Sequence, residues 1–168
     1  MRGSRASSRR SACVATAVPA CSISSPAFWR RNRGVTELPD IYKNYIECLN
    51  GQDWERLGQF VDEKVVHNDR PLGLAGYRAM LEGDFCAIPD LCFTIQLLVS
   101  EPPFVSCRLW FDCTPKGELF DLPVNGRKIQ FAENVFYKFQ AGRIAQVWSI
   151  IDKSVIEAQL AGSARHLE

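Results

Sequence analysis

The spacing of apolar residues along the chain changes once, from a helical period to the period of a β-strand. Apolar residues recur every three or four positions over 38–49, which predicts an amphipathic helix. Shorter stretches of the same period predict a second helix after Asp53 and a third from Gly76 to about Ala87, with a short strand over 65–68 between them. The first stripe is formed by Leu38, Ile41, Tyr42, Tyr45, Ile46 and Leu49, with Thr36 as candidate N-cap.

After Pro89, apolar and polar residues alternate, as they do along β-strands. Ala141-Gly142 is a hairpin signal between the last two strands, and Asp152 opens a short terminal helix. Helices followed by hairpin-connected strands are typical of the α+β class, so we expect a curved antiparallel sheet packed against the N-terminal helices. The predicted strands cover 91–99, 105–113, 128–139 and 143–151.

Apolar residues occur on both faces of these predicted strands, and both faces must be covered. We expect the helices to cover the concave face, and a second subunit or a further element to cover the convex face. Phe136, Trp148 and Ile150 are the candidate outer patch, which predicts a homodimer. In the first strand we expect a single row formed by Leu91, Phe93, Ile95, Leu97 and Val99.

Charge divides the chain into a basic N-terminal segment and a mildly acidic body. Residues 1–36 contain seven arginines and no acidic residue, whereas residues 37–168 contain 13 basic and 19 acidic residues. We interpret 1–36 as a disordered or targeting-like tail, 37–162 as one domain and 163–168 as a C-terminal tail. An acidic body argues against nucleic-acid binding, and no apolar run is long enough to span a membrane. We expect a cytoplasmic protein, or a mitochondrial one if the tail is a transit peptide.

The seven cysteines include no Cys-x-x-Cys pair and no histidine at ligand spacing. We therefore expect neither a metal site nor a redox motif. Four cysteines lie in apolar stretches, where reduced thiols of an intracellular protein are the simplest interpretation. These four are Cys86, Cys92, Cys107 and Cys113.

Several short motifs follow one another in a distinctive order. The motifs are Asp53-Trp54, Val66-His67, Ala87-Ile88-Pro89-Asp90, Thr114-Pro115-Lys116-Gly117, Leu122-Pro123-x-x-Gly126-Arg127, Gly142-Arg143-Ile144-x-x-x-Trp148-x-x-x-Asp152 and Gln159-Leu160. Their order resembles the SnoaL-like polyketide cyclase (ester cyclase) family of the nuclear transport factor 2-like superfamily, over about Leu38 to Gly162. The resemblance implies a cone-shaped, curved antiparallel sheet around helices, with one deep pocket. It also implies cofactor-free acid–base chemistry on a small carbonyl compound, commonly ring closure of a polyketide.

Three positions depart from the pattern of the family. Pro115 stands where the turn motif usually has histidine. Ser149 stands where the ring-closing members carry an acid–base aspartate, and their histidine on the preceding strand falls on Val135. The resemblance therefore implies the family and its general chemistry, but not the specific reaction.

Three residues are candidates for acid–base catalysis, each with a structural alternative. His67 has a near-neutral pKa and stands at a strand end, although it could bind loop backbone instead. Glu133 shares an apolar strand face, where burial would raise its pKa, unless Arg108 or Lys128 pairs with it. Asp152 fits the closing motif of the family, but it could cap the final helix.

Five further residues are candidates for substrate binding. Tyr137 could donate a hydrogen bond to an enolate oxygen or pack in the core. Ser149 could hold a water or a substrate oxygen, and Arg108 could bind a carboxylate or serve as a paired structural residue. Trp110 and Trp148 suit a pocket wall or an interface.

The sequence therefore favours an enzyme that closes a ring in a polyketide-like substrate. A dehydratase or isomerase using the same pocket is one alternative. A non-catalytic dimeric module that binds a small ligand is another, and the two classes of protein predict different pockets. An enzyme needs a buried histidine or carboxylate that faces the pocket, whereas a binding module would have a wholly apolar or filled interior.

Overall fold

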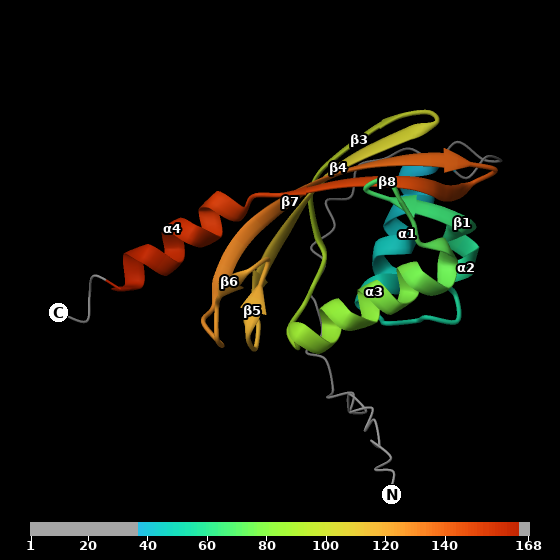
Figure 1. Ribbon diagram of the computed structural model, residues 1–168. Helices are drawn as coiled ribbons and strands as arrows, with labels where there is room; N and C mark the ends of the chain where they lie inside the picture. Colours follow the sequence, from blue (N-terminus) through green and yellow to red (C-terminus); the bar gives the residue numbers. More distant parts are fainter. Residues whose placement is uncertain (1–36, 165–168) are drawn as a thin grey trace, which may run out of the picture.

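The computed structural model describes residues 37–164 of the chain (Figure 1). Four helices and eight strands follow one another in the α+β order that the sequence predicts. The elements are α1 (Leu38–Asn50), α2 (Leu57–Phe60), β1 (Val61–His67), β2 (Arg70–Pro71), α3 (Gly73–Ala87), β3 (Thr94–Glu101), β4 (Phe104–Cys113), β5 (Glu118–Leu119), β6 (Leu122–Pro123), β7 (Ile129–Gln140), β8 (Arg143–Ile151) and α4 (Lys153–Ala164).

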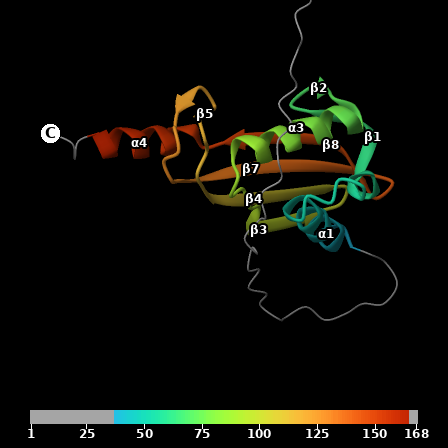
Figure 2. The same ribbon diagram turned by 90° about the horizontal axis from the view of Figure 1, so that it is seen from below.

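Six strands form one curved, unclosed sheet in the order β2-β1-β8-β7-β4-β3. All neighbours are antiparallel except β1 and β8, which run parallel. The helices α1, α2 and α3 lie together on the concave side, as Figures 1 and 2 show. The short strands β5 and β6 form a separate hairpin, and α4 projects away from the helices at the opposite end of the sheet.

The core lies between the concave face of the sheet and the helices. Along β4, every second residue is buried, as the alternating pattern predicts. The same alternation holds along β7 except at its middle, where Ala132 is buried and Glu133 is half-buried. Tyr42, Tyr45 and Leu49 of α1 pack against this surface and are almost completely buried. The predicted hairpin is confirmed, because Ala141 and Gly142 both adopt the positive φ angles that such a tight turn requires.

The single apolar row expected along the first long strand is wrong. Ile95 pairs with Leu109 and Leu97 pairs with Arg108, so two steps on β3 match one step on β4. This bulge at Gln96 reverses the orientation of the residues that follow. Leu97 and Val99 therefore lie on the outer face and are 58% and 55% exposed.

Other differences are local. The helix α3 begins at Gly73 rather than Gly76, β1 is longer than expected, and the hairpin of β5 and β6 was not predicted. The residue before α1 is Glu37. The expected cap, Thr36, lies outside the described residues. Cys107 and Cys113 are buried free thiols, whereas Cys92 is disulfide-bonded, contrary to expectation.

The basic segment 1–36 also lies outside the described residues, so its interpretation and the cellular location stay predictions. Within residues 37–164, none of the helices has the length and apolar character needed to cross a membrane.

Candidate active site

A cavity of about 200 Å³ lies between the concave face of the sheet and the helices. Its walls come from α1, β1, α3, β4, β7, β8 and the hairpin of β5 and β6. Most of the lining is aliphatic or aromatic, and a few polar groups interrupt it. The polar side chains that line the cavity are Tyr45, His67, Tyr77, Asp84, Glu133, Tyr137 and Ser149.

Glu133 and Ser149 are hydrogen-bonded partners on neighbouring strands. Glu133 is on β7 and Ser149 is on β8, and both point from the inner face into the cavity. The Ser149 hydroxyl donates to Oε1 of Glu133. Burial raises the pKa of the Glu133 carboxyl, the bond from Ser149 lowers it in part, and the negative charge of Asp84 raises it further. The alternative pairing of Glu133 with Arg108 or Lys128 does not occur.

His67 reaches the same cavity from the end of β1. Its imidazole ring lies 6.0 Å from the ring of Tyr77, measured between centroids. Burial lowers the pKa of His67, and the charge of nearby Arg70 lowers it further. The imidazole is therefore mainly neutral at neutral pH and able to accept a proton.

Three tyrosines supply hydroxyl groups at the cavity wall. The hydroxyls of Tyr45 and Tyr77 are hydrogen-bonded to each other at 2.8 Å, and both side chains are almost fully buried. Tyr137 packs its ring 6.1 Å from that of Tyr45. Burial raises the pKa of all three phenols, so they stay protonated and can donate hydrogen bonds.

Asp84 of α3 is a cavity residue that the sequence analysis did not select. Its side chain remains exposed, which places it at the mouth of the cavity. Desolvation by the surrounding protein raises its pKa to about 6. A signal was present in the sequence, because Tyr77, Leu81, Asp84 and Ile88 follow the helical spacing of one face, so Asp84 interrupts an otherwise apolar stripe.

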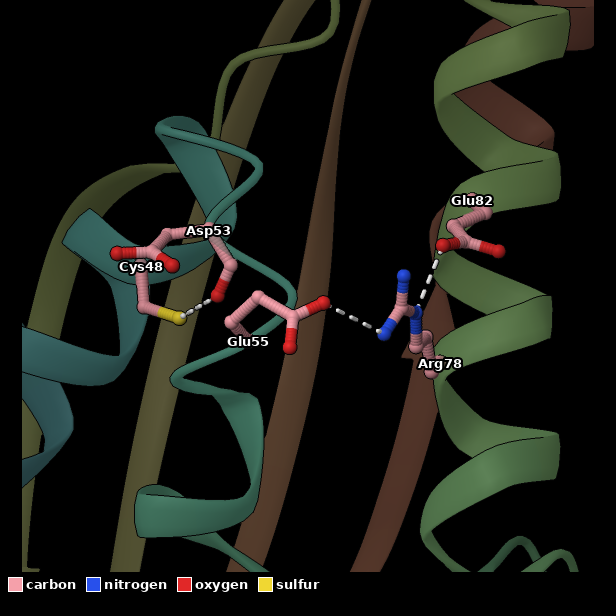
Figure 3. A network of polar contacts seen from close by, with 5 residues as sticks. All are labelled: Cys48, Asp53, Glu55, Arg78 and Glu82. Carbon is pink, nitrogen blue, oxygen red and sulfur yellow. Dashed lines mark hydrogen bonds and ion pairs between the residues drawn. The ribbon is translucent and has the colours of Figure 1, made fainter. Parts of the chain in front are cut away.

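A network of polar contacts holds α3 in place (Figure 3). The guanidinium of Arg78 binds Glu82 one turn along the helix, with Nε and Oε1 2.8 Å apart. The same guanidinium approaches Glu55, just before α2, at 3.6 Å. The contact with Glu55 links α3 to the segment before α2, whereas the contact with Glu82 lies within α3.

Four of the eight predicted site residues lie outside the cavity. Arg108 is on the outer face and donates hydrogen bonds to Gln96 and Asn134. Trp110 and Trp148 also lie on the outer face of the sheet. They pair with Ala132 and Phe136 on β7, and paired residues on neighbouring strands share a face. The pattern on the predicted strand had already placed Arg108 opposite the buried residues.

Asp152 also lies outside the cavity. It immediately precedes α4, and its Oδ1 accepts a hydrogen bond from the Ser154 hydroxyl at 2.8 Å. This position fits the structural alternative of a residue at the helix start rather than contact with a substrate.

Two of the positions that depart from the family pattern line the cavity. They are Val135 and Ser149, which face each other across β7 and β8. Pro115 is instead a buried turn residue whose carbonyl accepts a hydrogen bond from the Gly126 amide. No group of three His, Cys, Asp or Glu side chains in residues 37–164 could hold a metal ion.

Comparison with known families decides the relationship. The model of the SnoaL-like polyketide cyclase family matches residues 39–160. The chain belongs to this family. A SnoaL-like polyketide cyclase from Agrobacterium tumefaciens, known from its crystal structure, is 53% identical to this chain. Their match covers 75% of this chain and 99% of that one, with a TM-score of 0.74.

More distant members of the fold share the architecture at lower identity. IdmH from Streptomyces antibioticus is 22% identical, with a TM-score of 0.65 over 75% of this chain and 99% of its own. A protein from Acidithiobacillus ferrooxidans is 24% identical, with a TM-score of 0.63 over 74% of this chain and 94% of its own. No curated protein matches this SnoaL-like chain.

Proposed function

We propose that this SnoaL-like protein is a cofactor-free acid–base enzyme that closes a ring in a polyketide-like carbonyl substrate. The observation that carries the proposal is the position of Glu133, a carboxyl group held by Ser149 in a mainly apolar cavity and faced by tyrosine hydroxyls. A carboxyl whose pKa is raised towards neutrality is a stronger base when ionised and a ready acid when protonated.

The reaction begins with removal of a proton from the carbon next to a carbonyl group. Glu133 accepts this proton, and the electrons of the C–H bond pass to the carbonyl oxygen as an enolate. The hydroxyl groups of Tyr45 and Tyr77 stay protonated. One of their two protons forms the hydrogen bond between them, so the pair has one proton left to donate to the developing negative charge. His67 of β1 offers a second proton-accepting group that lines the same cavity.

Ring closure follows when the enolate carbon attacks a second carbonyl of the same molecule. A carbon–carbon bond forms, and the resulting alkoxide takes the proton back from Glu133. Attack through an enolate oxygen would give a pyrone instead, with the same groups moving the protons. The cavity also holds the flexible chain in a folded conformation, which contributes to the rate because the two reacting carbons are brought together.

The size of the cavity favours a small substrate. A cavity of about 200 Å³ is somewhat larger than the roughly 150 Å³ that encloses benzene in an engineered protein. It is smaller than the roughly 300–1,000 Å³ of pockets for drug-sized ligands. We therefore propose substrates whose enclosed part has one or two rings.

The polar groups also bear on the non-catalytic alternative. A module that only binds an apolar ligand gains nothing from a carboxyl group in its cavity, because burying an ionisable group costs free energy. Glu133 and His67 both line the cavity, which supports the enzyme. A dehydratase or isomerase would use the same groups and is distinguished by its products.

The linear triketone diacetylacetone tests the proposal, because its closure can be followed by NMR. Carbon attack gives orcinol and oxygen attack gives dimethyl-γ-pyrone, each with loss of one water. We expect the protein to accelerate closure above the rate in buffer, with one product favoured. A second assay follows exchange of the α-protons of the bicyclic ketone β-tetralone in D₂O. If the protein accelerates neither ring closure nor this exchange, it is not an acid–base enzyme.

A further inference from the structure

The mouth of the cavity carries a carboxylate that the proposed ring closure does not use. Asp84 lines the cavity from α3, and no side-chain hydrogen bond or ion pair of Asp84 occurs within the part of the chain that the structure describes. Because Asp84 is exposed, water can solvate its charge without a protein partner. Its position at the mouth brings this charge close to any molecule that enters the cavity.

The charges around the cavity are unbalanced. Neither lysine nor arginine occurs among the described residues that line it, and its one histidine has a lowered pKa. Asp84 and Glu133 lie close enough for the charge of Asp84 to raise the pKa of Glu133. Besides Asp84, the titratable groups that line the cavity are Tyr45 of α1, His67 of β1, Tyr77 of α3, and Glu133 and Tyr137 of β7. Arg70 of β2 does not line the cavity, but its charge acts on His67.

We propose that Asp84 restricts the cavity to neutral ligands, so that the substrates are uncharged carbonyl compounds rather than carboxylates or phosphates. An anion entering the cavity passes the ionised Asp84 and finds no fixed cation inside to compensate the repulsion. A neutral ketone carries no net charge for Asp84 to repel. The inference rests on the proposed function in taking this cavity as the substrate site, but its test measures binding and not turnover.

Two probes of the same shape and different charge test the proposal. Methyl β-naphthyl ketone is neutral, and β-naphthoate carries one negative charge. We expect titration calorimetry at about pH 8 to show at least about tenfold tighter binding of the ketone to the wild-type protein, because like charges a few ångströms apart repel by this order.

Asp84→Asn should improve the affinity for β-naphthoate about tenfold and change the affinity for the ketone by less than about twofold. The matched control is Glu82→Gln on the same helix, which removes one negative charge outside the cavity. Arg78 keeps its contact with Glu55 in this variant, so both affinities should stay unchanged.

A pH titration of the wild-type protein provides a readout that does not depend on the variant folding. Asp84 becomes protonated as the pH falls through about 6, whereas β-naphthoate stays ionised at about pH 5.5. The preference for the ketone should therefore shrink between about pH 8 and about pH 5.5. Equal binding of both probes at about pH 8, binding of neither probe, or an unchanged preference in Asp84→Asn would overturn the proposal. A protein that selects the ketone but fails to close diacetylacetone would leave this inference standing and refute the proposed reaction.

Discussion

Replacing Glu133 with glutamine separates catalysis from folding, because the two side chains have nearly the same shape. Glu133 is partly buried in the cavity, and its Oε1 accepts the hydrogen bond from Ser149. The amide oxygen of glutamine can accept the same bond. The variant therefore keeps the local geometry but loses the carboxyl group that accepts the proton.

The expected loss of activity follows from the role of the carboxylate. A positioned general base contributes about 10²–10⁴-fold to a proton transfer, which corresponds to about 2.7–5.4 kcal/mol of activation free energy. The substrate would still bind, because the apolar walls and the tyrosine hydroxyls remain. We therefore expect the turnover number for diacetylacetone to fall by this factor while the KM changes little.

In contrast to its lower activity, the variant should not lose folding stability. The folded-state pKa of Glu133 is raised, so folding favours the protonated form. Its contribution to stability is fully present below the pKa of the unfolded chain and is lost as the pH rises through the folded-state pKa. Glutamine does not ionise, so Glu133→Gln should be at least as stable as wild type at about pH 8.

The assay is NMR of the ring closure across a pH series, with thermal unfolding measured on the same samples. Wild-type turnover should rise with pH as Glu133 ionises. This rising limb of the pH–rate profile should disappear in Glu133→Gln. Ser149→Ala is the matched comparison, because it removes the hydrogen bond that opposes the raised pKa and should move the limb to higher pH. If Glu133→Gln is folded and turns over diacetylacetone at the wild-type rate, the assignment of Glu133 as the base is wrong.

Three further changes test other parts of the site and the outer face. His67→Ala should lower turnover by about 10²-fold or more if the neutral imidazole moves a proton, and an unchanged rate in NMR would remove it from the mechanism. Tyr77→Phe should lower turnover by about 10²–10³-fold as one oxyanion donor is lost. It should also destabilise the fold by about 1–3 kcal/mol because the buried Tyr45 hydroxyl loses its partner, as denaturant unfolding can measure. We also propose a homodimer through the outer face, where Phe136 and Ile150 are 48% and 63% exposed. Phe136→Asp should then convert a dimer to a monomer in sedimentation velocity, and a monomeric wild type would refute this.

The sequence was sufficient for the elements whose signal is local. The stripe of α1, the alternation along β4 and β7, and the turn at Ala141-Gly142 each depend on the period of neighbouring side chains. The bounds of β8 were predicted to the residue, as 143–151. The inner position of Glu133 also followed from this alternation, since Phe131 and Val135 share its face.

The parts that depended on distant contacts could not be obtained in this way. The bulge at Gln96 exists because β3 must match β4 along a curved sheet, and no local pattern marks it. Without the bulge, Leu97 and Val99 would belong to the core. The parallel pairing of β1 with β8, which brings His67 to the cavity, likewise joins segments about 80 residues apart.

The amino-acid sequence by itself determined the α+β class, the family and the inward face of the strand that carries Glu133. Only the tertiary structure decided which polar groups meet. It brought Asp84 and Tyr77 from α3 to Glu133 and Ser149, and it left Arg108, Trp110, Trp148 and Asp152 outside the cavity. The reason is that side-chain periodicity is set by local backbone geometry, whereas a cavity forms where a curved sheet and helices far apart in the chain close around the same space.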